Sequence, residues 1–192
     1  MASLNLVKGQ KLNLKKESGQ ALTQVKMGLG WEPAGGGLFG LGSGGSIDLD
    51  ASCIFFDENN NLLDQVWFQQ LKSKDGSVKH SGDNMTGEGE GDDEIISVDL
   101  TAIPTNVKTL VFTINSYRGQ TFDKVKNCFC RLFESGNGAE FCRYDLAEKG
   151  NHTGKIMAKV YRHNGEWKIS AEGRPCNGRT FKDMLPDIGS CL

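Results

Sequence analysis

The sequence contains no long apolar run. No segment approaches the roughly 18 consecutive apolar residues that a membrane-spanning helix needs. Residues 1–9 have neither the basic region nor the apolar stretch of a secretory signal. We therefore expect a cytoplasmic protein without a spanning segment.

The chain also lacks a basic stripe. Its formal net charge is −2 and its pI is about 5.9, so we do not expect nucleic acid as a partner. It has six cysteines, but 192 residues can form a core without disulfides, and in the cytoplasm we expect reduced thiols. Cys128 and Cys130 would lie on one face of a strand, which predicts small core side chains; a metal or redox pair is the alternative.

Helix-forming sequence is scarce, whereas the chain has 25 glycines and repeated Asn-Gly dipeptides. Short apolar or alternating segments recur with turn signals between them, which predicts an all-β sandwich of two mainly antiparallel sheets. We expect a single domain spanning residues 1–192, with one or two short helices at 121–126 and 180–185. The expected strands, about ten, are 11–14, 24–29, 52–57, 65–69, 95–99, 109–115, 127–134, 140–145, 155–163 and 166–171.

One segment, residues 35–45, is low in complexity and rich in glycine. It does not end in Gly-Lys-[Ser/Thr], so it is not a phosphate-binding P-loop. We interpret it as a surface loop. The alternative is a docking tip that presents Leu38, Phe39 and Leu41 to a partner or a membrane surface.

Acidic residues are concentrated between Gly82 and Glu94, where six carboxylates occur in thirteen residues without a lysine or arginine. Such a loop repels itself unless a cation neutralises it. Glycines at 87, 89 and 91 alternate with Glu88, Glu90 and Asp92, which would let several oxygens converge. The alternative without a binding function is a solvated acidic loop that contributes only solubility.

A second acidic feature is the pair Asp48 and Asp50, which directly precedes the apolar run Cys53-Ile-Phe-Phe. On a strand, residues two apart project to the same side, so both carboxylates would form one face. Unpaired charge is costly at the entrance to a buried strand. We therefore expect a cation or a basic partner there.

The donor types indicate which metal the two acidic features would bind. Asp83 and Glu94 span twelve residues, as in an EF-hand loop, but Met85 and Gly87 stand at ligand positions and Glu88 replaces the required glycine. Carboxylate and carbonyl oxygens favour Ca²⁺ or Mg²⁺ over Zn²⁺. Flexibility and ligand number favour Ca²⁺.

Four segments, two of which include these acids, resemble the TerD family of bacterial tellurium-resistance and stress proteins. They are Gly-Leu-Gly-Trp-Glu-Pro at 28–33, Ser-Ile-Asp-Leu-Asp-Ala-Ser-Cys at 46–53, the acidic stretch 80–94, and Phe-Thr-Ile-Asn-Ser-Tyr-Arg-Gly-Gln-Thr-Phe at 112–122. The resemblance implies a β-sandwich of two sheets that binds one or two Ca²⁺ ions through acidic loops, and it implies no catalysis. The chain departs from many members at Ser46, where they have a third aspartate, and at Gln69 and Gln70, where they have an asparagine pair.

The resemblance also implies a set of metal ligands, all of which have side-chain oxygens. These are Asp48, Asp50, Asp83, Asn84, Thr86, Glu88, Asp92, Asp93 and Glu94.

The leading hypothesis is a non-enzymatic, calcium-binding stress-response protein in which Ca²⁺ orders the acidic loops for partner binding. The resemblance suggests other Ter-type proteins as partners, in a complex peripheral to the inner face of the membrane. Two alternatives stay open. One is a metal-dependent hydrolase that uses the same acids, and the other is thiol chemistry on tellurium oxyanions through Cys128 and Cys130.

Overall fold

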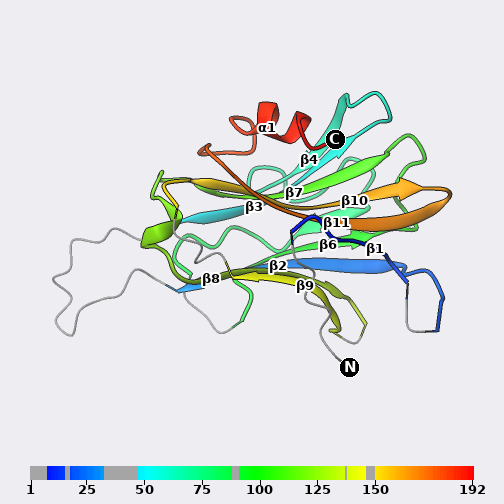
Figure 1. Ribbon diagram of the computed structural model, residues 1–192, viewed down its shortest axis with the longest axis horizontal. Helices are drawn as coiled ribbons and strands as arrows, with labels where there is room; N and C mark the ends of the chain where they lie inside the picture. The colour runs from blue at the N-terminus through cyan, green and yellow to red at the C-terminus, as the bar shows by residue number, and fades with distance from the viewer. Residues whose placement is uncertain (1–7, 16–17, 33–46, 88–90, 137, 146–149) are drawn as a thin grey trace, which may run out of the picture.

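Two antiparallel sheets stack face to face in the computed structural model, which describes residues 8–15, 18–32, 47–87, 91–136, 138–145 and 150–192 (Figure 1). The six-stranded sheet has the order β1-β11-β10-β7-β3-β4, and the five-stranded sheet has the order β5-β6-β2-β8-β9. The strands are β1 (Lys11–Asn13), β2 (Gln24–Glu32), β3 (Leu49–Phe56), β4 (Leu62–Val66), β5 (Val78–His80), β6 (Glu94–Asp99), β7 (Thr109–Ser116), β8 (Lys126–Glu134), β9 (Glu140–Asp145), β10 (Gly154–His163) and β11 (Glu166–Cys176).

The predicted sandwich is confirmed, and each of the ten expected strands corresponds to an observed one. The eleventh strand, β5, has only three residues, too few to show an alternating pattern. The expected helix at 121–126 is a single 3-10 turn, Phe122–Lys124, and the one expected at 180–185 begins later, as α1 (Leu185–Gly189). Within the described ranges, no helix is long and apolar enough to cross a membrane.

β3 is the most deeply buried strand, with both of its faces covered. Ala51, Cys53 and Phe55 face the core between the sheets, whereas Ile54 and Phe56 face outward. The C-terminal segment with α1 packs on that outer face, above the six-stranded sheet (Figure 1). Because the apolar residues cover both sides of β3, any charged residue on this strand must lie at its end.

The acidic loop between β5 and β6 packs directly against β2 at Gly87, Gly91 and Asp92. A Cβ atom at Gly28 would lie 2.4 Å from the Asp92 carboxylate, and one at Gly30 would lie 2.5 Å from the carbonyl oxygen of Gly91. At Gly87 the φ angle is +68°, and a Cβ atom would lie 2.4 Å from the Trp31 indole nitrogen. Glycine therefore permits the close approach of loop and strand at these positions.

We expect Gly28→Ala to destabilise the protein by about 1–3 kcal/mol, the usual cost of inserting a methyl group into a packed contact. The added Cβ would displace Asp92, so the loop would have to lift from β2. Urea unfolding monitored by tryptophan fluorescence measures the change. Gly189→Ala is the matched control, because a Cβ atom there meets nothing within 4 Å. Equal stabilities of the two variants would contradict the close packing.

Candidate metal centre

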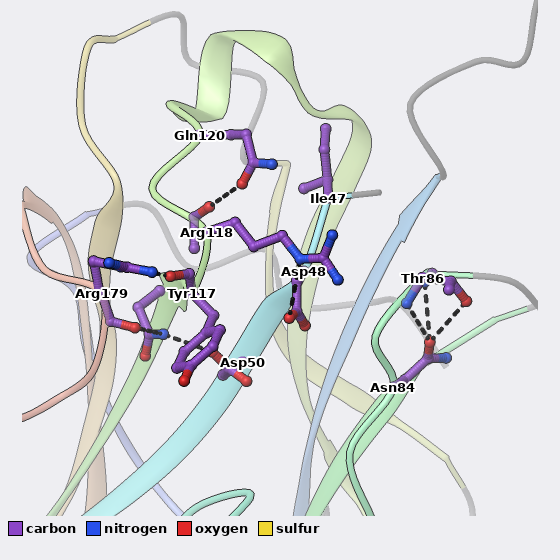
Figure 2. Close-up of polar contacts among 12 residues, drawn as sticks. Ile47, Asp48, Asp50, Asn84, Thr86, Tyr117, Arg118, Gln120 and Arg179 are labelled. Atoms are coloured by element: carbon purple, nitrogen blue, oxygen red, sulfur yellow. Dashed lines mark hydrogen bonds and ion pairs between the residues drawn. The ribbon is translucent and has the colours of Figure 1, made fainter. Parts of the chain in front are cut away.

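Three aspartates converge at one end of the sandwich. Asp48 directly precedes β3, Asp50 is its second residue, and Asp83 lies in the loop that follows β5. Each offers a carboxylate oxygen, and these atoms all lie within 4.8 Å of one another. Figure 2 shows Asp48 and Asp50 near the beginning of β3. The structure thus brings together the two acidic features that the sequence presents 33 positions apart.

Glu94 fixes the acidic loop beside β3. The pairing of β3 with β4 begins only at Cys53, so the earlier part of that edge has no strand partner. There the backbone N–H of Ala51 donates to Glu94 Oε2 at 2.8 Å, and the N–H of Asn84 donates to Glu94 Oε1 at 3.2 Å. The fully buried Glu94 side chain therefore holds Asp83, next to Asn84, close to the start of β3.

Trp31 provides a second attachment between the strands and the loop. Its indole N–H donates to the carbonyl oxygen of Ile47 at 3.1 Å, just before Asp48. Its backbone N–H donates to Asp93 Oδ2 at 2.9 Å, and Asn84 Nδ2 donates to Asp93 Oδ1 at 3.1 Å. These bonds position both sides of the aspartate group with neutral donors, so they add no positive charge to it.

The centre has more negative than positive charge. Asp48 and Asp50 are 4% and 2% exposed, and the nearest cation is Arg118, whose Nε lies 3.7 Å from Asp48 Oδ2 (Figure 2). Burial and the charge of Asp83 raise the pKa of Asp48, and Arg118 opposes the rise. Burial, with repulsion from Glu94 and Asp48, raises the pKa of Asp50 to about 8. Both carboxylates are therefore poorly compensated.

Several buried oxygens around the aspartates have no hydrogen-bond partner among the described residues. Asn115 Nδ2 donates to Asp50 Oδ2 at 2.8 Å, but Asn115 Oδ1 and Asp48 Oδ1 are both unpaired. The hydroxyls of Ser52 and Thr113, which are paired positions of β3 and β7, are likewise unpaired. Leaving such groups unsatisfied is costly. A bound ion or an ordered water could supply the partner that these oxygens lack.

The other predicted ligands that the structure describes have hydrogen-bond or ion-pair partners within the protein. Asn84 Oδ1 accepts hydrogen bonds from the N–H groups of Thr86 and Gly87, which closes a local turn (Figure 2). Asp92 forms a two-bond ion pair with Arg131, at 2.9 and 2.8 Å. Asp93 and Glu94 hold the loop as described above, and Glu88 lies outside the described residues, as does Ser46.

Sequence reasoning did not identify Asn115 as a neighbour of the centre. Asn115 is opposite Asp50 in the register between β7 and β3, and it is the next-to-last residue of β7. A buried amide near the end of a strand was the available signal. Only the pairing of strands distant in sequence shows which residue it faces.

A family model described as the TerD domain matches residues 1–187. The chain belongs to the TerD family. It is 48% identical to the tellurium resistance protein TerZ of Serratia marcescens, with 98% of each chain covered. It is 40% identical to stress response protein SCP2 of Bacillus subtilis, with 95% and 98% covered.

A solved structure supports the fold assignment. The crystal structure of a telluride resistance protein (TerD) homologue from Streptomyces coelicolor A3(2) superposes with a TM-score of 0.76. The match covers 88% of this chain and 98% of that one, at 19% identity. At this identity the likeness shows that the two-sheet architecture is shared.

We expect the metal-free protein to lose stability as the pH rises from about 4 to about 8. Asp50 has a folded pKa of about 8, and an unfolded aspartate has one of about 3.9, so between these values the folded state holds an extra proton. That stabilisation is complete below the unfolded pKa and is lost towards pH 8, with a slope of up to about 1.4 kcal/mol per pH unit.

Asp50→Asn should flatten this dependence, because asparagine carries no ionisable group. Glu58→Gln, a change at an exposed turn, should leave it unchanged. Urea unfolding in the presence of a chelator at pH 5 to 8.5 measures all three proteins. A wild-type slope equal to that of Asp50→Asn would show that Asp50 is not the group responsible.

Proposed function

We propose that this TerD-family chain is a non-enzymatic Ca²⁺-binding protein whose centre is formed by Asp48, Asp50 and Asp83. The observation that carries the proposal is the convergence of these three carboxylates within 4.8 Å, two of them buried. One arginine at 3.7 Å does not balance three acids and the nearby Glu94. A divalent cation would balance more of this negative charge.

The donor chemistry favours Ca²⁺. The described donors are carboxylate, amide and hydroxyl oxygens, and Ca²⁺ accepts six to eight such ligands in flexible geometry. His80 is the nearby nitrogen donor, but its Nδ1 accepts the N–H of Gly82 at 3.1 Å and its Nε2 lies 3.2 Å from Glu94 Oε2. The site therefore offers few of the nitrogen and sulfur ligands that Zn²⁺ prefers.

Ion binding would connect two parts of the molecule. Asp48 and Asp50 belong to the six-stranded sheet and Asp83 to a loop of the five-stranded sheet. A shared ion would tie the loop to β3 and displace the partly exposed Arg118 from Asp48. A partner that requires the ordered loop would then bind more tightly.

The biological role that we propose follows from the relatives. Their names associate them with tellurium resistance and stress response, and we propose a stress role for this chain, with other Ter-type proteins as partners at the cytoplasmic face of the membrane. We propose no catalytic activity.

We expect Ca²⁺ to bind with Mg²⁺ present in excess and to raise the melting temperature. The double variant Asp48→Asn/Asp50→Asn should bind roughly 100-fold more weakly or not at all, because it removes two of three charged ligands. Isothermal titration calorimetry gives affinity and stoichiometry, and thermal unfolding gives the stabilisation.

Asp92→Asn is the matched control for this titration. It removes one carboxylate from the same acidic loop, but Asp92 pairs with Arg131 and is not part of the aspartate group. It should lower stability and retain Ca²⁺ affinity. Absence of heat with Ca²⁺, or an equal loss of affinity in Asp92→Asn, would contradict the proposed centre.

The described cysteines do not favour thiol chemistry on tellurium oxyanions. Cys53, Cys128, Cys130, Cys176 and Cys191 are buried thiols that form no disulfide among the described residues. Burial raises the pKa of the Cys128 thiol well above its ordinary value and that of Cys176 to about 12. Reactive cysteines need an exposed site that stabilises the thiolate.

We expect at most one of the six thiols to react rapidly with Ellman's reagent in the native protein at pH 8. All six should react after unfolding in guanidinium chloride. The absorbance of the released thiolate counts them. Rapid native reaction of Cys128 or Cys130, identified by mass spectrometry, would restore the thiol hypothesis.

A further inference from the structure

A hollow of about 360 Å³ lies on the five-stranded sheet, away from the aspartate group. Its lining comes from β2, β6 and the region around β5, and includes Lys26, Lys79, Ser77, Ser97 and Asp99. Its size falls in the range of small-molecule sites, roughly 300–1,000 Å³.

Two lysines flank one serine across three neighbouring strands. Ser97 of β6 is paired with Lys26 of β2 on one side and with Lys79 of β5 on the other. Paired residues project from the same face, and neighbouring strands are about 4.8 Å apart. The two lysine stems therefore begin about 10 Å apart, with the serine hydroxyl between them.

A third lysine lies at the rim. The backbone of Lys72 forms an isolated β-bridge with that of Lys79. Gly76 lines the hollow, and a Cβ atom at Gly76 would lie 3.4 Å from Lys72 Nζ. Among the described residues, none of these three lysines has an ion-pair partner. The lining has one carboxylate, that of Asp99, whose Oδ1 accepts the N–H and the hydroxyl of Thr101. Positive charge is therefore in excess.

One residue of the lining, Ser77, has a buried and unsatisfied hydroxyl. Ser77 is 3% exposed, and its hydroxyl has no hydrogen-bond partner among the residues that the structure describes. Its backbone is held in place, because its N–H donates to Asp75 Oδ1 at 2.7 Å and its carbonyl accepts the N–H of Asp99 at 2.8 Å. A buried hydroxyl without a partner is costly unless a ligand or water supplies one.

We propose that this hollow binds a small soluble molecule that carries a phosphate group. The lysine ammonium groups and the serine hydroxyl between them suit a dianion with several acceptor oxygens better than a planar monoanionic carboxylate. The volume leaves room for an organic part beside the phosphate. The site is distinct from the aspartate group and does not depend on the proposed Ca²⁺ binding.

Titration of metal-free protein with inorganic phosphate and with glycerol 3-phosphate, followed by amide chemical shifts, tests the proposal. Saturable shifts are expected at Lys26, Ser77, Lys79 and Ser97. Lys26→Gln/Lys79→Gln should weaken binding about tenfold or more, because two charge-assisted hydrogen bonds are lost. Ser77→Ala should weaken it severalfold without loss of stability, since its hydroxyl is unpaired in the free protein.

Two control variants separate this site from general attraction and from the metal centre. Lys108→Gln/Lys124→Gln removes two exposed lysines outside the hollow and should bind as the wild type does. Asp48→Asn/Asp50→Asn should also retain phosphate binding. Non-saturable shifts, or equal weakening in Lys108→Gln/Lys124→Gln, would overturn the proposal.

Vesicles of phosphatidic acid in phosphatidylcholine distinguish a lipid headgroup from a soluble ligand. Saturable binding of glycerol 3-phosphate with no cosedimentation on vesicles is the expected result. Cosedimentation that requires Lys26 and Lys79, without binding of either soluble phosphate, would overturn the proposal in favour of a membrane surface.

Discussion

The buried carboxylate of Glu94 is the contact on which the candidate metal centre depends. Its oxygens accept the N–H groups of Ala51 in one sheet and of Asn84 in the loop of the other. A carboxylate that is fully buried must be well hydrogen-bonded, because desolvation of an unpaired charge costs several kcal/mol or more. The two N–H groups meet that need only when the loop lies against the start of β3. These two hydrogen bonds therefore hold Asp83 beside Asp48.

The acids of this region fall into two groups according to their partners. Asp92 has Arg131, and Asp93 has neutral donors from Trp31 and Asn84. These acids hold the loop on β2. Asp48 and Asp50 are more deeply buried but have only one partly exposed arginine, 3.7 Å from Asp48, and one amide among the described residues. Carboxylates whose charge the protein itself leaves uncompensated are the ones that gain most from a cation.

Most of the fold could be predicted from the sequence. For the site, the pairing of Asp48 with Asp50 could be predicted, but the partners of the acids in the loop could not. Strand alternation and turn dipeptides located ten strands, because each signal is local, whereas β5 has three residues and leaves no period to detect. Strand geometry alone predicts that Asp48 and Asp50 project to the same side. It does not predict that Asp92 pairs with an arginine while Asp83 joins the aspartate group. That difference depends on Arg131, a residue of β8 that the pairing of β2 with β8 brings close to Asp92. A run of acids in sequence cannot show which of them has a cationic neighbour in space.

The near-neutral net charge conceals two opposite local imbalances on the same hairpin. The loop joining β5 to β6 contributes Asp83 to the acidic centre, while Lys79 and Ser97 of the two strands line the basic hollow. A lysine on a short edge strand such as β5 has an ordinary explanation, since it discourages pairing with another sheet edge. Lys26 does not share it. It lies on β2, which is paired on both sides, so edge protection accounts for Lys79 but not for Lys26. The proposed ligand would account for Lys26 and for the unpaired hydroxyl of Ser77.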